Sequence, residues 1–247
     1  AALLSVSGWA SAQISGTVTV GTGGTYTSWA ALATAINSGV SGPVTVNVIS
    51  DLTSSSTIEF TANSTNPTTS TNTITIKGNG YKLGSSNTYA AIRLNGIDYL
   101  TIDGLIIQNT GTSTAQSGIH FIGGADYNTI KNCTIEYTSL SSGSTSGGAY
   151  IVFSASNTSL TSMTSSYCGS YNTIDNNLMR TTNSNSPGPT YAICDNGSSS
   201  IYSSTPSNNT FSNNTIENFY YYGIRNYYTN GDQFVNNDIS RANATTN

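Results

Sequence analysis

Pairs of apolar positions five residues apart recur along the second half of this chain. Each pair belongs to an eleven-residue segment that occurs five times, with a glycine or an asparagine between the apolar positions. The copies are YLTIDGLIIQN (99–109), YNTIKNCTIEY (127–137), YNTIDNNLMRT (171–181), NNTFSNNTIEN (208–218) and GDQFVNNDISR (231–241). Self-similarity of this kind indicates that each copy is one structural unit.

The aligned copies form three columns that predict a strand, a sharp bend and a second strand. The apolar columns hold Ile102, Ile130, Ile174, Phe211 and Phe234, and then Ile107, Ile135, Met179, Ile216 and Ile239. The column between them holds Gly104, Asn132, Asn176, Asn213 and Asn236. Glycine and asparagine accept a left-handed backbone at low cost, so this column predicts the bend. Stacking the copies would bury the apolar columns and let the asparagines hydrogen-bond along the stack.

A shorter apolar element precedes each copy and supplies a third strand per turn. These elements are AAIRL (90–94), SGIHF (117–121), AYIVF (149–153), YAICD (191–195) and YGIRN (222–226), aligned on Ile92, Ile119, Ile151, Ile193 and Ile224. The step between these isoleucines varies from 27 to 42 residues, and the longest step contains a Ser- and Thr-rich insertion at about 154–170. Repeating strands joined by loops of variable length indicate a solenoid. The predicted fold class is all-β, a right-handed parallel β-helix with three strands per coil; the hand follows the general preference of parallel crossovers.

The N-terminal part of the chain predicts a helix that caps this solenoid. Thr27 or Ser28 can cap the helix at its start, and Gly39 can end it. Its apolar positions, at helical spacing, are Trp29, Leu32, Ala33 and Ile36. An amphipathic helix at this place would cover the open first coil, whose strand edges and apolar interior would otherwise be exposed.

The sequence predicts three parts. Residues 1–13, AALLSVSGWASAQ, contain a small-x-small pattern ending at Ala12 that is typical of signal peptidase sites. We therefore expect a truncated secretory signal there, with an ordinary N-terminal strand as the alternative. Residues 14–43 hold the first strand and the capping helix, and residues 44–247 hold the β-helix, with early strands at 44–49, 57–60 and 73–77. Because RANATTN at the end follows a strand without a cap, we expect the β-helix to continue beyond the C-terminus.

Composition supports a folded, elongated domain and excludes several classes of function. The 247 residues are 36% hydrophobic and only 7% charged, and the net charge is −4. An acidic balance argues against nucleic acid as a partner, and no apolar run approaches the ~20 residues of a membrane-spanning helix. Cys133, Cys168 and Cys194 show no zinc-binding spacing; buried thiols, or one disulfide with a spare thiol, are both open. No cofactor and no metal site is predicted.

Several segments resemble a family of large secreted or cell-surface proteins. VGTGGTYTSWAALATAINSG near the start, GPVTVNVISDLT after it, YLTIDGLIIQNT in the middle and the recurrent NTIxNNxI are similar to the surface β-helix proteins of Bacteroidetes. The resemblance covers nearly all of the chain after Gln13. It implies an exported, adhesin-like β-helix, and members of this family often carry a sorting domain for the type IX secretion system.

Charged residues fall into two columns when the copies are stacked. The first contains Asp103, Lys131, Asp175, Ser212 and Val235, and the second contains Gln108, Glu136, Arg180, Glu217 and Ser240. Opposite charges therefore lie on successive coils, about 4.8 Å apart. These columns predict an outward salt-bridge ladder, and the alternative is an acid–base or cation site around Asp175 or Glu136. The ladder is favoured because a neighbouring base lowers the pKa of a carboxyl group.

A third set of polar residues suggests a ligand-binding face. The column beside the stacked isoleucines contains Arg93, His120 and Arg225, and Asp195 stands one residue after it. We expect these four residues on the outer face of one sheet. Tyr221 and Tyr227, in a tyrosine-rich coil, supply flat amphipathic area suited to sugars or proteins. The alternatives are a lone surface or loop-packed histidine for His120 and loop-lining tyrosines. No catalytic residue is assigned.

The function predicted from the sequence is that of a secreted or cell-surface structural, adhesin-like rod. Its expected partner is an extracellular polysaccharide or a surface protein, and the oligomeric state stays open. Because parallel β-helices also include polysaccharide lyases and glycoside hydrolases, such an enzyme is the alternative. It would require acids or the four polar residues above to converge in one groove. Scattered and ion-paired acids would favour the adhesin-like rod.

Overall fold

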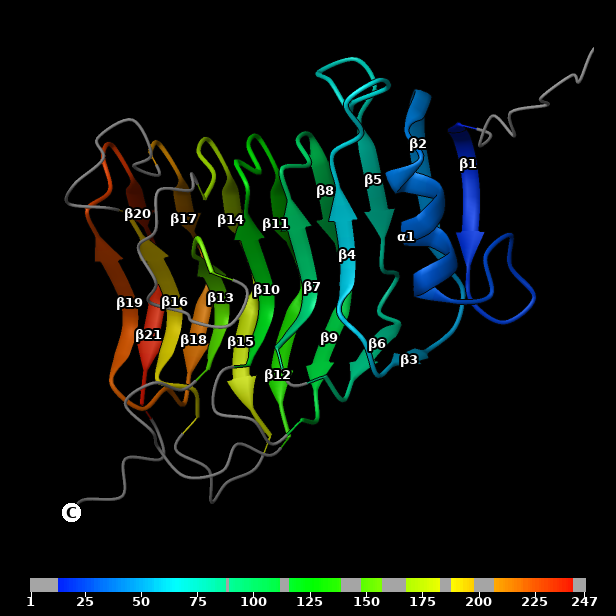
Figure 1. The fold of residues 1–247 in the computed structure, drawn as a ribbon. Coiled ribbons are helices and arrows are strands. Elements are labelled where there is room, and N and C mark those ends of the chain that lie inside the picture. Colours follow the sequence, from blue (N-terminus) through cyan, green and yellow to red (C-terminus); the bar gives the residue numbers. More distant parts are fainter. Residues whose placement is uncertain are drawn as a thin grey trace, which may run out of the picture.

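The computed structural model describes residues 13–87, 89–111, 116–138, 148–156, 168–182, 188–197 and 207–241. Within these residues the chain winds into a parallel β-helix whose coils stack side by side along one axis (Figure 1). Three parallel sheets, here called A, B and C, form its walls. The predicted all-β, parallel β-helical fold class is therefore confirmed. The predicted signal segment at 1–12 and most of the Ser- and Thr-rich insertion lie outside the described residues.

Each sheet takes one strand from each successive coil. Sheet A consists of β1 (Ile14–Val20), β2 (Val40–Val48), β5 (Ile74–Lys77), β8 (Leu100–Asp103), β11 (Thr129–Lys131), β14 (Thr173–Asp175), β17 (Thr210–Ser212) and β20 (Gln233–Val235). Sheet B consists of β3 (Leu52–Ser54), β6 (Lys82–Ser85), β9 (Ile106–Asn109), β12 (Thr134–Tyr137), β15 (Leu178–Thr181), β18 (Thr215–Glu217) and β21 (Asp238–Ser240). Sheet C consists of β4 (Ile58–Thr61), β7 (Ala90–Asn95), β10 (Ser117–Ile122), β13 (Ala149–Phe153), β16 (Tyr191–Asn196) and β19 (Tyr222–Tyr227).

The three apolar columns predicted from the repeats are the interior of the β-helix. In sheet A, Ile130 pairs with Ile102 on one side and with Ile174 on the other. In sheet B the column runs through Ile135 and Met179, and these side chains are fully buried. Isoleucines stack in the same way in sheet C. Like residues therefore lie on top of each other, and burying each of them stabilises the stack by roughly 1.5–3 kcal/mol.

The predicted capping helix is present as α1 (Trp29–Asn37), beside β4 and β1 at the N-terminal end (Figure 1). Ser28 caps it, because its side chain accepts a hydrogen bond from the backbone of Ala31 (3.2 Å). Asn37 then covers the open edge of β4: its Nδ2 donates to Glu59 O (2.9 Å), and its Oδ1 accepts from Thr61 N (2.8 Å). A side-chain amide thus takes the place of a neighbouring strand at an edge that would otherwise be unpaired.

The bend column also takes the predicted conformation. Gly104 has φ of 70°, and Asn132, Asn176 and Asn213 have φ between 53° and 55°. Their side chains lie on the outside of the coil, where Nδ2 of Asn176 donates to Oδ1 of Asn132 (2.7 Å). Left-handed residues at the same place in successive coils let the two strands of each copy meet at a fixed angle.

Two other asparagine columns lie inside the bends and carry most of the buried polar bonds. They consist of Asn128, Asn172 and Asn209, and of Asn177, Asn214 and the half-buried Asn237. The backbone N–H of Asn172 donates to Oδ1 of Asn209 (2.9 Å), and that of Asn177 donates to Oδ1 of Asn214 (3.0 Å). Nδ2 of Asn177 donates to Ile130 O (2.9 Å). These side chains satisfy backbone groups at the corners, where the sheets are interrupted.

A column of tyrosines marks another corner of the coil. Tyr99, Tyr127 and Tyr171 all have positive φ, and their rings stack in parallel with centroids 5.1 and 4.9 Å apart. Each inner ring face is covered by the next ring. The column therefore presents ring edges rather than open ring faces to solvent.

The three cysteines are free and buried, which decides between the two alternatives left open by the sequence. Burial raises the pKa of both the Cys133 and the Cys168 thiol to about 12, so neither is a reactive thiolate at neutral pH. In the part of the chain that the structure describes, no helix is long and apolar enough to cross a membrane.

Substitution of a buried asparagine should cost much more stability than substitution of the exposed asparagine next to it. Asn177→Ala removes the acceptor for the backbone N–H of Cys133 (3.0 Å) and the donor to Ile130 O, leaving buried groups unpaired. We expect a loss of about 2–5 kcal/mol in the free energy of unfolding, measured by urea denaturation. Asn176→Gly, at an exposed left-handed position, is the matched control and is expected to cost less than about 1 kcal/mol. Equal losses in the two variants would contradict this account.

Candidate functional site

Two of the predicted ligand-binding residues lie on the outer side of sheet C but are covered. Arg93 and His120 are register partners on β7 and β10 and are only 8% and 3% exposed. Nη1 of Arg93 pairs with Oε2 of Glu59 (3.1 Å), and Nε2 of His120 lies 3.0 Å from Ser154 O. Burial, followed by the nearby Arg93 guanidinium, lowers the pKa of His120 to about 4, so the imidazole is neutral near pH 7. These contacts hold the sheet together and offer no accessible surface.

The expectation that Asp195 lies on the same outer face is wrong. Asp195 stands two residues after Ile193, and alternate residues of a strand point to the same side of the sheet. It is therefore directed into the interior, where it pairs in register with Phe153 of the preceding coil. Its side chain is fully buried.

The remaining predicted residues form an aromatic cluster in the last described coil. The Arg225 guanidinium lies 4.6 Å from the ring centroid of Tyr227 and 5.6 Å from that of Tyr191. Tyr221 is 50% exposed and Tyr227 is 42% exposed. The six predicted residues are thus divided among a covered pair, an interior acid and an exposed cluster. A ligand-binding role for Arg225, Tyr221 and Tyr227 stays a prediction.

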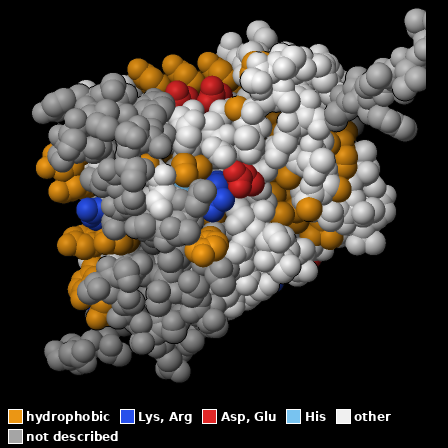
Figure 2. All heavy atoms as spheres, viewed as in Figure 1, with side chains coloured by type: hydrophobic (Ala, Val, Ile, Leu, Met, Phe, Trp, Pro, Cys, Tyr) orange, Lys and Arg blue, Asp and Glu red, His pale blue; other side chains and the backbone are white. Residues whose placement is uncertain are grey.

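The charged columns form the expected ladder. Nζ of Lys131 lies 3.4 Å from Oδ2 of Asp103, and Nη2 of Arg180 lies 3.1 Å from Oε2 of Glu136. Hydrogen bonds from Ser212 and then Asn213 lower the pKa of Asp175 and hold it as a carboxylate. Charged side chains are sparse on the face viewed in Figure 2, in keeping with a charged fraction of 7%.

Among the described residues, no group of three or more His, Cys, Asp or Glu side chains is placed to hold a metal ion. Three acids of the ladder are instead engaged: Asp103 and Glu136 pair with bases, and Asp175 accepts hydrogen bonds from Ser212 and Asn213. A carboxylate stabilised in this way is a poor proton donor.

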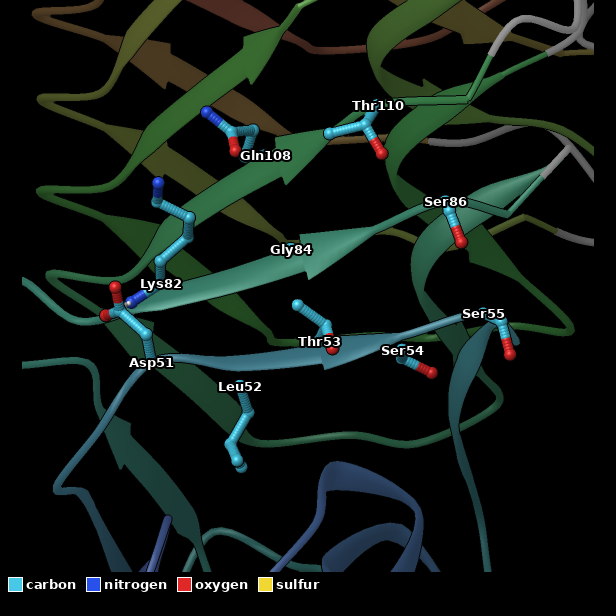
Figure 3. A pocket seen from close by; sticks show the side chains of 10 residues that line it. All are labelled: Asp51, Leu52, Thr53, Ser54, Ser55, Lys82, Gly84, Ser86, Gln108 and Thr110. Carbon is cyan, nitrogen blue, oxygen red and sulfur yellow. Dashed lines mark hydrogen bonds between the residues drawn. The ribbon is translucent and has the colours of Figure 1, made fainter.

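A groove on the outer face of sheet B is the best candidate for a binding site (Figure 3). It crosses the first three strands of that sheet, β3, β6 and β9, and has a volume of about 620 Å³. Its lining consists of Asp51, Leu52, Thr53, Ser54, Ser55, Lys82, Gly84, Ser86, Gln108 and Thr110. A volume of this size falls within the range of small-molecule sites, and most of the lining residues carry polar side chains.

The groove exists because a glycine interrupts an outward-facing column. Thr53 of β3 pairs with Gly84 of β6, and Gly84 pairs with Gln108 of β9. Gly84 does not need to be glycine for its backbone, because its φ is not in the left-handed region. A Cβ added there would meet only Cγ2 of Thr53 at 3.3 Å and Leu52 O at 3.9 Å. The missing side chain therefore leaves a hollow between two filled positions of the column.

The two ends of the groove differ in chemistry. Asp51 and Lys82 stand at one end, where Oδ1 of Asp51 accepts a hydrogen bond from the backbone N–H of Lys82 (2.8 Å) (Figure 3). The Lys82 ammonium makes no ion pair with any described residue. Ser86 and Ser55 lie at the other end. Their hydroxyls make no hydrogen bond within the described part of the chain, so they can bond to a ligand. Thr53 instead turns its methyl group, Cγ2, toward Gly84.

Other lining groups are already engaged. Nε2 of Gln108 donates to Oε1 of Glu136 (2.6 Å), the Thr110 hydroxyl donates to Ser85 O (3.1 Å), and the Ser54 hydroxyl donates to Ser56 O (2.7 Å). These bonds fix the wall of the groove. The groups left for a ligand are therefore the ammonium of Lys82, one oxygen of Asp51, Oε1 of Gln108 and the hydroxyls of Ser55 and Ser86.

The groove was not predicted from the sequence, because the early strands before Ala90 were not aligned with the five copies of the repeat. One signal was available. TITIKGNGYKLGS (73–85) is a sixth, degenerate copy of the repeat, and it places Gly84 where the next copy has Gln108. A glycine at a position that otherwise carries a long side chain indicates a gap in the surface.

Comparison with known proteins gives little beyond the fold. No protein-family model and no curated protein matches the chain. Two crystal structures of the pectin methylesterase from Aspergillus niger, one of them in deglycosylated and one in penultimately deglycosylated form, are similar, with TM-scores of 0.40 and 0.39 and sequence identities of 13% and 14%. The match covers 95% of this chain and 88% of each of theirs. The likeness is one of architecture.

The buried histidine predicts a specific loss of stability in acid. The folded pKa of His120, about 4, lies below the ordinary 6.5, so its contribution is complete above pH 6.5 and is lost as pH falls toward 4. The expected loss in the free energy of unfolding is about 3 kcal/mol between pH 6.5 and 4. His120→Val, which copies Val152 of the next coil, should lower stability at pH 7 but remove this part of the pH dependence. Urea denaturation of both proteins between pH 4 and 7 measures the free energy of unfolding. An identical pH dependence in the two proteins would contradict its assignment to His120.

Proposed function

We propose that this protein is an exported β-helix that binds a saccharide in the groove over β3, β6 and β9. The observation that carries the proposal is the hollow at Gly84, with unpaired hydroxyls on one side of it and an unpaired ammonium on the other. Location outside the cytoplasm is part of the proposal. It is supported by the signal-like segment at the start of the sequence and by the resemblance to surface β-helix proteins.

The free groups in the groove suit a sugar for a chemical reason. A hydroxyl group both donates and accepts hydrogen bonds, and sugar hydroxyls need partners of both kinds. Ser55 and Ser86 offer such groups, Lys82 offers donors and Asp51 offers an acceptor. A nucleic acid would not find its complement here, because the groove has only one cation.

The groove is favoured over the exposed tyrosines as the saccharide site. Sugars bind aromatic rings through open ring faces, whereas both faces of Tyr127 are covered by neighbouring rings at about 5 Å. In the last described coil, the Arg225 guanidinium lies over Tyr227 at 4.6 Å, and Tyr221 packs edge to face against Tyr220 at 4.4 Å. The groove also lies on the flat wall of a rigid rod, where its lining residues stand on three paired strands. Such a rod would display the site at a distance from whatever anchors the protein, which suits an adhesin-like role.

Turnover of a polysaccharide is the second candidate function. The observation in its favour is that Asp51 and Lys82 stand together at one end of the groove, so that an acid and a base could meet a bound sugar there. Hydrolysis by the common mechanism needs a second carboxyl group about 5–10 Å from the first. The groove lining contains one carboxylate, so binding without turnover is preferred.

Filling the hollow tests the proposal. Gly84→Gln places the side chain of the next coil into the groove, and we expect the affinity for an oligosaccharide to fall at least about tenfold, or 1.4 kcal/mol. Stability should stay unchanged or rise by up to about 1 kcal/mol, because glycine weakens a strand. The matched control is Gly42→Gln on β2, where a new Cβ would meet only Ser15 at 3.6 Å. Its binding should equal that of the unmodified protein.

The ligand for this test comes from an array of neutral and acidic oligosaccharides, followed by calorimetry with the tightest of them. Absence of binding on the array, or equal affinity in Gly84→Gln and Gly42→Gln, would refute the groove as a saccharide site. The same glycans are incubated with the protein and assayed for new reducing ends and for unsaturated products. Cleavage that disappears in Asp51→Asn would make the groove an enzyme active site instead.

A further inference from the structure

An acid interrupts the apolar column inside sheet C. The inward positions that follow the stacked isoleucines are Phe60, Leu94, Phe121, Phe153, Asp195 and Asn226. Four large apolar side chains are thus followed by a carboxyl group that is fully buried. A buried carboxylate without a cationic partner is costly, so a specific arrangement must keep Asp195 in place.

A second acid stands next to it at the end of a buried asparagine column. Asn128, Asn172 and Asn209 are followed in the last described coil by Asp232, and the backbone N–H of Asn209 donates to Oδ1 of Asp232 (2.9 Å). Nδ2 of Asn209 donates to Oδ2 of Asp195 (3.1 Å). Asn209 therefore binds both acids and holds their carboxyl groups within hydrogen-bonding reach of each other.

One oxygen of each acid is left over. Oδ1 of Asp195 and Oδ2 of Asp232 are buried and have no hydrogen-bond partner. Two carboxylate oxygens can bond to each other only through a proton, because an ionised carboxylate accepts but does not donate. A calcium ion would need six to eight oxygen ligands, far more than the two that are unpaired here. The geometry fits a single proton.

The surrounding groups give the pair no positive charge. Asp195 is faced by the Cys168 thiol from the segment before β14 and by Asp232 from the segment before β20. Asn226 and Thr229 contact Asp232. Cys194 and Arg225 are on neighbouring strands of sheet C but point to its outer side, where Nη1 of Arg225 contacts Cys194 (3.7 Å). Within the described residues, neither acid takes part in an ion pair.

We propose that Asp195 and Asp232 share one proton, and that this O–H···O bond fastens the coil of β19–β21 to the coil of β16–β18 and releases it when the proton is lost. No other bond is made or broken in this step: the proton passes to solvent, and two adjacent carboxylates remain. Like charges at this distance in a buried site repel each other strongly. The joint is therefore closed in acid and opens as pH rises.

The direction of the effect follows from linkage. Burial, and then the charge of Asp232, raises the pKa of Asp195 well above its usual range, and burial also raises the pKa of Asp232. An acid whose folded pKa exceeds its unfolded value stabilises the fold fully below about pH 3.8 and loses that contribution as pH rises through the folded pKa. This direction is opposite to that of His120, which destabilises the middle coils in acid.

Amide hydrogen exchange, followed by mass spectrometry at pH 5 to 9 and corrected for intrinsic rates, tests the proposal in the whole protein. Peptides from 191–196 and 222–240 are expected to lose protection by about tenfold per pH unit above pH 5 until the proton is gone. Peptides from β2 and β6 serve as the internal reference. Those from β8 and β11 do not, because they adjoin Asp98, whose pKa is raised to about 6 by partial burial and gives a pH dependence of the same direction.

Asparagine is the replacement for both acids, because neighbouring coils already carry it at the corresponding positions. Asn226 is the register partner of Asp195, and Asn209 precedes Asp232 in its column. The double variant Asp195→Asn with Asp232→Asn should show no pH dependence of protection in the last coils and more protection at pH 8 than the unmodified protein. If the double variant does not fold, Asp232→Asn alone keeps the acceptor for Asn209 and gives the unpaired oxygen of Asp195 an amide donor in place of the shared proton. Its slope should be smaller than that of the unmodified protein, and the remainder comes from the burial of Asp195. Uniform protection of the unmodified protein across this pH range, a slope that persists in the double variant, or an unchanged slope in Asp232→Asn would overturn the proposal. Protection that depends on added CaCl₂ and is lost in EDTA would also overturn it, because a bound cation would then take the place of the proton.

Discussion

The structure depends on the in-register stacking of parallel coils. Each strand pairs with the strands one coil before and one coil after, so Ile130 lies between Ile102 and Ile174, and the same holds for every interior column. A slip of one residue would turn the apolar side chains outward, which fixes the register. The buried asparagines extend this stacking through the corners, where Asn177 and Asn214 bond to backbone groups that no strand can reach. Because each coil contacts only its neighbours, the stability of the rod is a sum of local terms.

A repeating structure of this kind has a uniform surface, and functional features arise where the repetition fails. Gly84 is such a failure on the outside, because the positions before and after it in the same column carry Thr53 and Gln108. Asp195 is another on the inside, where four apolar residues precede it. In both places the backbone continues undisturbed, so the change concerns only the side chain. The fold can therefore carry a groove or a buried acid without losing its architecture.

Electrostatics follow the same division between the outside and the inside. On the outside, few charges are present and those of the ladder neutralise each other, as Asp103 and Lys131 do. Such exposed pairs contribute little to stability and mainly favour one register. On the inside, burial governs the ionisable groups: it lowers the pKa of His120 and raises that of Asp195. One physical cause thus makes different coils respond to pH in opposite directions.

The sequence by itself determined the β-helical fold, the three apolar columns and the left-handed bends, because each of these is written in a local pattern that repeats. It also predicted the capping helix, with Thr27 or Ser28 as its cap, and the structure assigns that role to Ser28. It also placed the charged ladder correctly, since equal spacing in the repeats implies vertical neighbours. Only the tertiary structure decided which polar residues are accessible. Arg93 and His120 are covered by contacts between segments far apart in the chain, and Asp195 meets Asp232 across a coil boundary. The groove at Gly84 depends on what its vertical neighbours carry, and a missing side chain has no sequence pattern of its own. Accessibility and enclosure are properties of several coils together, which no single repeat can specify.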